Sequence, residues 1–267
     1  MKITSRENPR VKQARSLLQR RGRAKAGRWL VEGVRVLEEA FRHGHPPETI
    51  FYTAESGNDA RVQNILQRAA QWGIACYEVP ARLLAEMSDA RTPQGIVAVV
   101  PTPRMSGDGF SHQDAVPLVL VIDRIQDPGN LGTMLRTALA VGVTGVALVH
   151  GTVDPGHPKA IRSSAGAVFG LPIAVYQPDE LIGKLRQNNM RLIALDVRGD
   201  VSLYEVPWNE PTALLVGHEA HGPSERLLKE ADIIAHIPMP GGGESLNAAT
   251  AVAVCLYEAL RQRAAVH

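Results

Sequence analysis

The chain has 267 residues, of which 45% are hydrophobic and 21% charged, so it can form two ordinary domains with full apolar cores. This composition excludes a disordered polymer, and no apolar run approaches the length of a membrane span. The amino-terminal residues lack the hydrophobic core of a signal peptide, so we expect a cytoplasmic protein without membrane contact.

Positive charge is concentrated at the amino terminus. Residues 1–28 contain ten lysines and arginines against the single acid Glu7, whereas the net charge of the whole chain is only +2. This segment therefore has an excess of nine positive charges, and the rest of the chain has a net charge of −7. Such a field attracts polyanions, of which RNA is the obvious one. The alternative is a solvated basic helix that has no partner.

The first hundred residues alternate between helical and strand patterns. Residues 9–21 have a basic pattern with a thin apolar stripe, which predicts a helix. Further helices are expected at 34–43, 60–72 and 81–87, and strands at 29–31, 50–52, 76–79 and 95–100. We therefore expect a small α/β domain over residues 1–100.

Residues 101–117 combine Pro, Gly, Ser and Asp with little apolar content, which predicts an interdomain linker. A second domain is expected over residues 118–267, where apolar strands alternate with helices. Its strands are expected at 118–122, 145–149, 173–175, 192–197, 212–216 and 233–237, and its helices at 131–141, 158–168, 178–188, 223–230 and 246–263. This alternation predicts an α/β fold with a mostly parallel sheet that is covered by helices on both faces. Ligands of such sheets bind beyond the carboxyl ends of the strands.

The loop after the first of these strands has an unusual content. It runs from Asp123 to Arg136 and includes the turn signal Asp127-Pro-Gly, followed by Asn130, which can cap a helix. Arg136 lies six positions after Asn130, somewhat under two helical turns, so both side chains can face the same end of the sheet. The loop alone equally allows a plain cap and a surface arginine.

The loop Val216-Gly-His-Glu-Ala-His-Gly-Pro-Ser224 has a carboxylate, Glu219, between two glycines that permit tight turns. Two histidines beside a glutamate suggest a metal site. His218 and His221 nevertheless have no obvious third ligand, and the two cysteines, Cys76 and Cys255, have no Cys-x-x-Cys spacing. We therefore expect neither a metal nor a disulfide, but two buried thiols.

A third loop, from Ile237 to Asn247, contains three consecutive glycines that let a ligand approach the backbone closely. Ser245 and Asn247 place polar groups at the start of the last helix, where free N–H groups can bind an anion. The loop is not a Walker loop, because no Gly-Lys-Ser/Thr follows it. No Gly-x-Gly-x-x-Gly follows the first strand either, which argues against a nucleotide-dependent oxidoreductase.

Taken together and in this order, the three loops resemble the SpoU (TrmH-like) RNA 2′-O-ribose methyltransferases of the SPOUT superfamily. The resemblance rests on Asp127-Pro-Gly-Asn-Leu-Gly-Thr with Arg136-Thr-Ala, Gly217-His-Glu219 with Gly222, and Ile237-Pro-Met with Glu244-Ser-Leu-Asn247. The residues Lys2-Ile-Thr-Ser-Arg-Glu-Asn-Pro-Arg and Trp29-Leu-Val-Glu-Gly33 are similar to the substrate-binding domain that precedes the catalytic domain in many members.

The resemblance implies a deep trefoil knot in the carboxyl-terminal domain and S-adenosylmethionine as the cofactor. The residues that it places around the cofactor are Leu195, Gly217, Ile237, Met239 and Leu246. The residues that it places at the reacting ribose are Arg136, Asn130, Glu219, Ser245 and Asn247. Arg136 would either deprotonate the 2′-hydroxyl or stabilise the developing alkoxide, and its guanidinium stays protonated in water.

The resemblance also implies a homodimer through the catalytic domain and structured RNA as the partner, ribosomal RNA before transfer RNA. Two alternatives stay open at this point. One is a non-catalytic RNA-binding protein of ribosome assembly on the same fold, against which the complete set of polar residues argues. The other is an enzyme whose substrate is transfer RNA.

Overall fold

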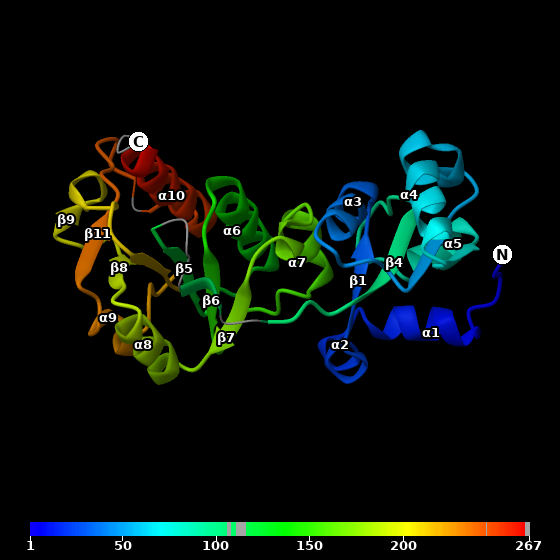
Figure 1. Cartoon of the computed structure of the whole chain (residues 1–267), viewed down its shortest axis with the longest axis horizontal. Helices are drawn as coiled ribbons and strands as arrows, with labels where there is room; N and C mark the ends of the chain where they lie inside the picture. Colours follow the sequence, from blue (N-terminus) through cyan, green and yellow to red (C-terminus); the bar gives the residue numbers. More distant parts are fainter. Residues whose placement is uncertain (106–107, 111–115, 244, 265–267) are drawn as a thin grey trace. The chain divides into compact units, whose positions relative to one another are not determined.

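The computed structural model describes residues 1–105, 108–110, 116–243 and 245–264. The chain forms two compact units, which Figure 1 shows in sequence colours. The first unit comprises Met1–Arg104 together with Asp154–Gly170, and the second comprises Met105–Val153 together with Leu171–His267. Within the described residues, no helix is both long enough and apolar enough to cross a membrane.

The first unit has a four-stranded mixed sheet in the order β1-β4-β2-β3. Strand β4 is antiparallel to both β1 and β2, and β2 is parallel to β3. The strands are β1 (Arg28–Glu32), β2 (Thr49–Tyr52), β3 (Ala75–Glu78) and β4 (Ile96–Pro101). The helices are α1 (Pro9–Ser16), α2 (Arg20–Ala26), α3 (Val34–Arg42), η1 (Ser56–Asn58), α4 (Ala60–Gln71), α5 (Ala81–Ala85), α7 (Pro158–Ser163) and η3 (Ala167–Phe169).

The basic helix expected at residues 9–21 is two helices, α1 and α2, because the backbone is extended at Gln19. The buried side chain of Arg23 explains the break. Its guanidinium donates to the carbonyl oxygens of Leu17 and Leu18, each at 2.9 Å, and so satisfies acceptors that α1 leaves free at its end. Gly22 makes the close packing possible, since a Cβ there would lie 1.9 Å from the carbonyl oxygen of Ser16.

Residues 154–170 were expected within the second domain, but they belong to the first unit. Asp154 accepts two hydrogen bonds from Arg23, at 2.9 and 2.7 Å, and the ring centroid of Phe169 lies 6.0 Å from that of Trp29. The guanidinium of Arg162 lies 3.6 Å from the buried carboxylate of Glu32. These polar and aromatic contacts join positions far apart in the chain, so strand and helix periodicity gave no sign of them.

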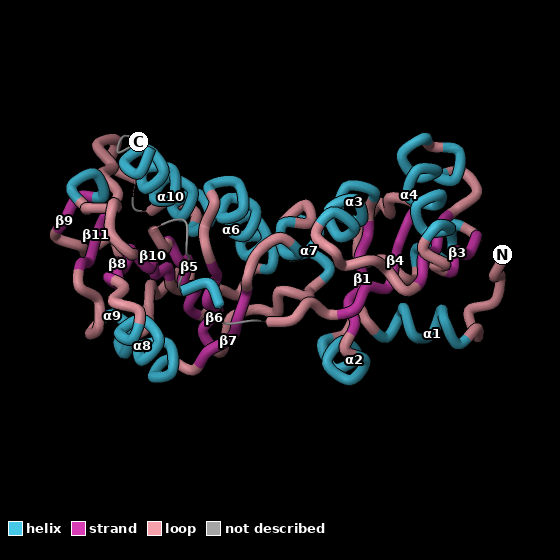
Figure 2. Tube along the Cα trace, viewed as in Figure 1, coloured by secondary structure: helices cyan, strands magenta, loops and turns pink. Residues whose placement is uncertain are grey.

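The second unit has a parallel seven-stranded sheet in the order β7-β6-β5-β10-β8-β11-β9. Its strands are β5 (Leu118–Asp123), β6 (Gly145–Val149), β7 (Ile173–Tyr176), β8 (Arg191–Leu195), β9 (Val201–Ser202), β10 (Thr212–Val216) and β11 (Ile233–His236). Its helices are η2 (Asp108–Phe110), α6 (Pro128–Val141), α8 (Pro178–Gln187), η4 (Leu203–Glu205), α9 (Glu225–Leu228) and α10 (Ala248–Ala264). Figures 1 and 2 show α6 and α10 on one face of the sheet and α8 and α9 on the other.

The expected α/β class is confirmed, and β9 is the strand that sequence patterning missed, because two residues show no periodicity. Part of the expected linker is packed. Phe110 is buried against Tyr176, with ring centroids 5.7 Å apart, and residues 106–107 and 111–115 of that linker lie outside the described residues. The knot that the family resemblance implies stays a prediction.

The strand order changes direction between β5 and β10. Strands β6 and β7 lie on one side of β5, and β8, β11 and β9 lie beyond β10. Loops that follow two such strands diverge and leave a crevice at the carboxyl edge of the sheet. Since β5 leads into Asn130 and β10 leads into Glu219, two expected site loops meet at this point.

Candidate functional site

The loop after β5 ends in a regular helix start. The side chain of Asp127 accepts from the backbone N–H of Asn130 at 2.9 Å, and Pro128 occupies the first position of α6. Asp127 is therefore the N-cap, not Asn130 as the sequence suggested. The side chain of Asn130 is thereby free to reach residues outside its own loop.

The loop after β10 is a tight turn. His218 pairs with Gly222 in an isolated bridge, and a Cβ on Gly217 would lie 1.9 Å from the nitrogen of Pro223. The Nδ1 atom of His218 accepts from the N–H of Ala220 at 3.1 Å, and the ring of His218 stacks on that of His221 with centroids 4.9 Å apart. The turn therefore fixes the position from which Glu219 projects.

Three loops are joined by a chain of side-chain hydrogen bonds, which we call the amide relay: Glu219, Asn130 and Asn247. Asn247 Nδ2 donates to Asn130 Oδ1 at 3.0 Å, and Asn130 Nδ2 donates to Glu219 Oε1 at 3.1 Å. Because a carboxylate only accepts, Glu219 fixes which end of the Asn130 amide faces it. The orientation of Asn130 in turn fixes that of Asn247.

Glu219 is an ionised anchor of this relay. Burial raises the pKa of its carboxyl, but hydrogen bonds from Asn130 and from backbone N–H groups, including those of Asp127 and Gln126, outweigh burial and lower the pKa below the ordinary 4.5. The backbone N–H groups of Asp127 and Gln126 donate at 3.4 and 3.5 Å. A carboxylate held in this way is an orienting group, and the relay is lost only as the pH falls through that lowered pKa.

The other end of the relay starts the last helix. Asn247 Oδ1 accepts from the backbone N–H groups of Ala249 and Thr250, at 2.9 and 3.2 Å. One side chain therefore both caps α10 and holds Asn130. This double use places the start of α10 beside the loops that follow β5 and β10.

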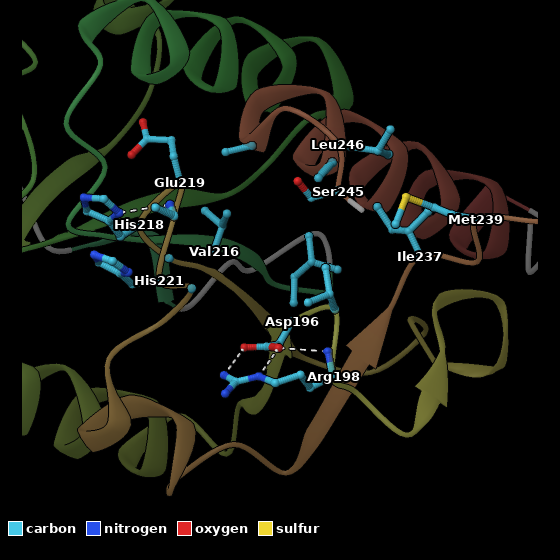
Figure 3. Close-up of a pocket in the computed structure, with 17 residues that line it drawn as sticks. Asp196, Arg198, Val216, His218, Glu219, His221, Ile237, Met239, Ser245 and Leu246 are labelled. Carbon is cyan, nitrogen blue, oxygen red and sulfur yellow. Dashed lines mark hydrogen bonds and ion pairs between the residues drawn. The ribbon is translucent and has the colours of Figure 1, made fainter. Parts of the chain in front are cut away.

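A cavity of about 560 Å³ lies next to the relay, and Figure 3 shows the side chains that line it. All five residues expected around the cofactor line it, together with Glu219 and Ser245. Val216, Ile237, Met239 and Leu246 form an apolar wall. Asn130, Asn247 and Arg136 are not among the lining residues.

Polar side chains also line the cavity. Asp196 lies directly after β8, and its two carboxylate oxygens accept from Nε and NH2 of Arg198, at 2.9 and 2.8 Å. The hydrogen bond from Arg198 lowers the pKa of Asp196. We did not predict this pair, although a charged residue directly after a buried strand is a signal that a search of strand ends would find. His218 and His221 also line the cavity.

The family models match both parts of the chain. A model described as the SpoU rRNA Methylase family matches residues 117–257, and one described as an MRM3-like substrate binding domain matches residues 8–98. The chain belongs to the SpoU rRNA methylase family. This confirms the family that the sequence resembles.

Relatives in this family align along nearly the whole chain. The 23S rRNA (guanosine(2553)-2′-O)-methyltransferase RlmP of Bacillus subtilis is 32% identical, over 96% of this chain and 97% of its own. The 23S rRNA (uridine(2479)-2′-O)-methyltransferase of Streptomyces viridochromogenes is 34% identical, over 98% and 92%.

Solved structures of family members share the fold. The SpoU methyltransferase AviRb of Streptomyces viridochromogenes superimposes with a TM-score of 0.87 at 32% identity, covering 97% of this chain and 99% of its own. The AdoMet-bound rRNA methyltransferase of Sinorhizobium meliloti does so with a TM-score of 0.86 at 30% identity, covering 98% and 97%.

The cavity suits S-adenosylmethionine, the cofactor of this family. Its volume falls within the range of about 300 to 1,000 Å³ that is typical of small-molecule sites. The apolar wall can receive an adenine ring, and Gly217 leaves backbone groups accessible there.

Among the described residues, no three His, Cys, Asp or Glu side chains are grouped so that they can hold a metal ion. Cys255 is buried and Cys76 is only half-buried, so one of the two expected buried thiols is partly accessible.

Two expected site residues stand apart from the relay. Arg136 is exposed on α6 and has no hydrogen-bond or ion-pair partner among the described residues. Ser245 is exposed at the rim of the cavity. Glu244, which belongs to the matching motif, lies outside the described residues.

Two substitutions at Asn247 separate its two hydrogen-bonding roles. Asn247→Ala removes the cap of α10, and we expect it to lower the free energy of unfolding by about 1 kcal/mol. Asn247→Asp keeps the cap, but its carboxylate then faces an acceptor in the relay, so stability stays near that of the wild type while methyl transfer falls about tenfold, as for one lost hydrogen bond. Urea unfolding and a methyl-transfer assay measure the two effects. An Asn247→Asp variant with the wild-type rate would show that the relay does not contribute.

Proposed function

We propose that this chain transfers the methyl group of S-adenosylmethionine to a ribose 2′-hydroxyl of ribosomal RNA in the cytoplasm. The observation that carries the proposal is the amide relay of Glu219, Asn130 and Asn247 beside a cavity whose lining includes every residue expected around the cofactor. Both RlmP of Bacillus subtilis and its Streptomyces viridochromogenes relative are named as methyltransferases of 23S rRNA, which supports large-subunit RNA as the substrate before transfer RNA.

The residues around the cavity bind and align the two reactants. When bound, S-adenosylmethionine supplies a methyl group already activated on a sulfonium sulfur. Ile237, Met239 and Leu246, which line the cavity, would hold the adenosine, and Leu195 and Gly217 would contribute to its binding. The enzyme then has to hold the ribose oxygen in line with that methyl group and assist the loss of its proton.

Arg136 stabilises the 2′-oxygen as its proton passes to solvent water and its bond to the transferred methyl group forms. A guanidinium stays protonated in water, so it acts through its charge and its N–H donors and not as a base. Among the described residues, no carboxylate is paired with Arg136, so none of them compensates its charge. We assign Glu219 an orienting role instead, because both of its oxygens accept hydrogen bonds from residues that follow β5.

Ion pairs within the first unit indicate which of its basic side chains are available to RNA. Of the ten basic side chains in residues 1–28, six contact carboxylates. These are Lys2, Arg6, Lys12, Arg15, Arg23 and Arg28. The other four have no acidic partner among the described residues. They are Arg10, which lies over the ring of Tyr77, and the α2 residues Arg20, Arg21 and Lys25. We therefore assign the main RNA contact of the first unit to α2.

The catalytic unit forms a homodimer through α10. Tyr257 and Leu260 are 55% and 38% exposed, and their spacing of three residues places them side by side on the helix. Exposed apolar side chains grouped on one helix face are typical of a protein interface. A second copy of this chain is the partner that we propose.

The reaction is tested by mapping 2′-O-methyl groups in total RNA from cells that lack the protein. Re-expression of the wild type is expected to restore methylation at one or a few ribosomal riboses, and expression of Arg136→Ala is expected not to restore it. Calorimetry should show that the variant binds S-adenosylmethionine as the wild type does, since Arg136 does not line the cavity. Unchanged ribose methylation in the absence of the protein would contradict the proposal, and cofactor binding without transfer would favour a non-catalytic RNA-binding protein.

The role of α2 is tested by comparing two triple variants that each remove three positive charges. Arg20→Ala/Arg21→Ala/Lys25→Ala is expected to weaken RNA binding strongly and to reduce the slope of log affinity against log salt by about three. Arg6→Ala/Lys12→Ala/Arg15→Ala is the control, because these side chains already contact carboxylates. Equal effects of both variants would show that only total charge matters.

The dimer is tested by sedimentation velocity. Tyr257→Glu/Leu260→Glu is expected to shift the wild-type dimer to a monomer, because charges would have to be buried in the interface. Tyr204→Glu is the control, since Tyr204 is similarly exposed, at 57%, but lies on η4. A monomeric wild type, or a double variant that stays dimeric, would exclude this interface.

A further inference from the structure

Arg124 has a left-handed backbone directly after β5. Its φ is 58°, and among the described non-glycine residues only Ala165 and Asn189 also have a positive φ. This conformation is unfavourable for any residue with a Cβ, and it persists only where the surroundings enforce it. Such a residue at the edge of a functional site suggests a use for its side chain.

The loop after β6 holds the backbone of Arg124 in place. Thr152 Oγ1 accepts from the N–H of Arg124 at 2.9 Å, and Gln126 Nε2 donates to the carbonyl oxygen of Arg124 at 2.9 Å. The same Gln126 nitrogen donates to the carbonyl oxygen of Gly151 at 2.8 Å. Both backbone polar groups of Arg124 are therefore hydrogen-bonded, which fixes the direction in which its side chain leaves the sheet.

The guanidinium of Arg124 contacts a carboxylate through one atom, as an ion pair without a hydrogen bond. Its Nε is buried and lies 3.4 Å from Asp123 Oδ1, and Asp123 has a side chain only 1% exposed. The Arg124 side chain as a whole is nevertheless 43% exposed, and its terminal amino groups have no partner among the described residues. Two N–H-bearing groups thus reach solvent from a preoriented arginine, an arrangement suited to the oxygens of a phosphate.

The position of Arg124 separates it from the cofactor cavity and brings it near the amide relay. The cavity is lined by residues that follow β8, β10 and β11, whereas Arg124 lies between β5 and the loop after β6. Gln126, two residues further on, donates its backbone N–H to Glu219. A ligand of Arg124 therefore approaches from outside the cavity, on the side of β5 away from it.

We propose that Arg124 binds a backbone phosphate of the RNA strand that presents the target ribose. This inference rests on the proposed function, because it takes RNA as the substrate of the same edge. Arg124 thereby fixes the register of the strand relative to Arg136 and the relay, and the unfavourable backbone is retained because it aims the guanidinium at that phosphate.

The test uses Arg124→Gly and Arg124→Asn, which remove the guanidinium and accept a positive φ readily. Arg124→Lys keeps the charge but not the paired donors. The control is Arg186→Asn, because Arg186 is 71% exposed on α8, whose last turn precedes β8 at the amino edge of the sheet. The probe is large-subunit ribosomal RNA from cells that lack the protein, measured in binding at several salt concentrations and in methyl transfer.

For Arg124→Gly and Arg124→Asn, we expect RNA affinity to fall about tenfold and the slope of log affinity against log salt to decrease by about one. Arg124→Lys should recover part of the affinity, Arg186→Asn should match the wild type, and the affinity of every variant for S-adenosylmethionine should be unchanged.

Two results would overturn the inference. Wild-type RNA binding by Arg124→Gly and Arg124→Asn with reduced thermal stability would make Arg124 only a counterion of Asp123. Weaker S-adenosylmethionine binding with RNA affinity intact would assign Arg124 to the carboxylate of the cofactor. If the wild type binds RNA but transfers no methyl group, the proposed function fails, while the binding comparison still decides on Arg124.

Discussion

The arrangement of the site depends on the negative charge of Glu219. A carboxylate accepts hydrogen bonds and cannot donate them, so it orients the Asn130 amide, and Asn130 orients Asn247. Asn247 also caps α10, which makes the start of the last helix part of the same network. Loops that follow β5, β10 and β11 would otherwise move independently, because loops at a sheet edge have few packing partners. The ionised carboxylate of Glu219, which lines the cavity, therefore connects it to the loop after β5, and this loop leads into the helix of Arg136.

Much of this site could be predicted from the sequence, but through the family resemblance and not from strand and helix patterns. The parallel sheet explains why the predicted residues meet, because it collects the ends of its strands at one edge. Leu195, Gly217 and Ile237 lie far apart in the chain, yet each follows or ends a strand, and all three line one cavity. The partners within the site could not be predicted. Asp127 is the N-cap of α6, a position for which Asn130 is equally suitable by residue type. Because Asp127 caps the helix, the Asn130 side chain can donate to Glu219. Capping preferences do not distinguish the two residues, and only the positions of all three loops decide.

The first unit shows a different limit of sequence analysis. The count of ten basic residues is correct as composition, but it overstates the free charge, since six of them contact carboxylates. Four of these six pair with acids elsewhere in the chain, and the other two share Glu7. The buried Arg23 illustrates this. Its guanidinium donates to a carbonyl oxygen at the end of α1 and to the carboxylate of Asp154. Its role is structural although its residue type suggests RNA binding. Local charge density therefore shows where basic residues gather, and ion pairing decides which of them keep a free charge.

The two reactants of this family place opposite electrostatic demands on the enzyme. The cofactor has a positive sulfonium, so an uncompensated cation in the cavity would repel it. An uncompensated carboxylate would stabilise the bound cofactor as much before methyl transfer as in the transition state, which does not speed the reaction. The charged groups that line the cavity meet this demand, because Asp196 is paired with Arg198, and both oxygens of Glu219 accept from N–H donors. The RNA strand is a polyanion and needs cations that keep free donors. Arg136 and Arg124 have them, and neither lines the cavity. With compensated charge inside the cavity and uncompensated charge outside it, this sheet edge is suited to the cationic cofactor and the polyanionic RNA that we propose for it.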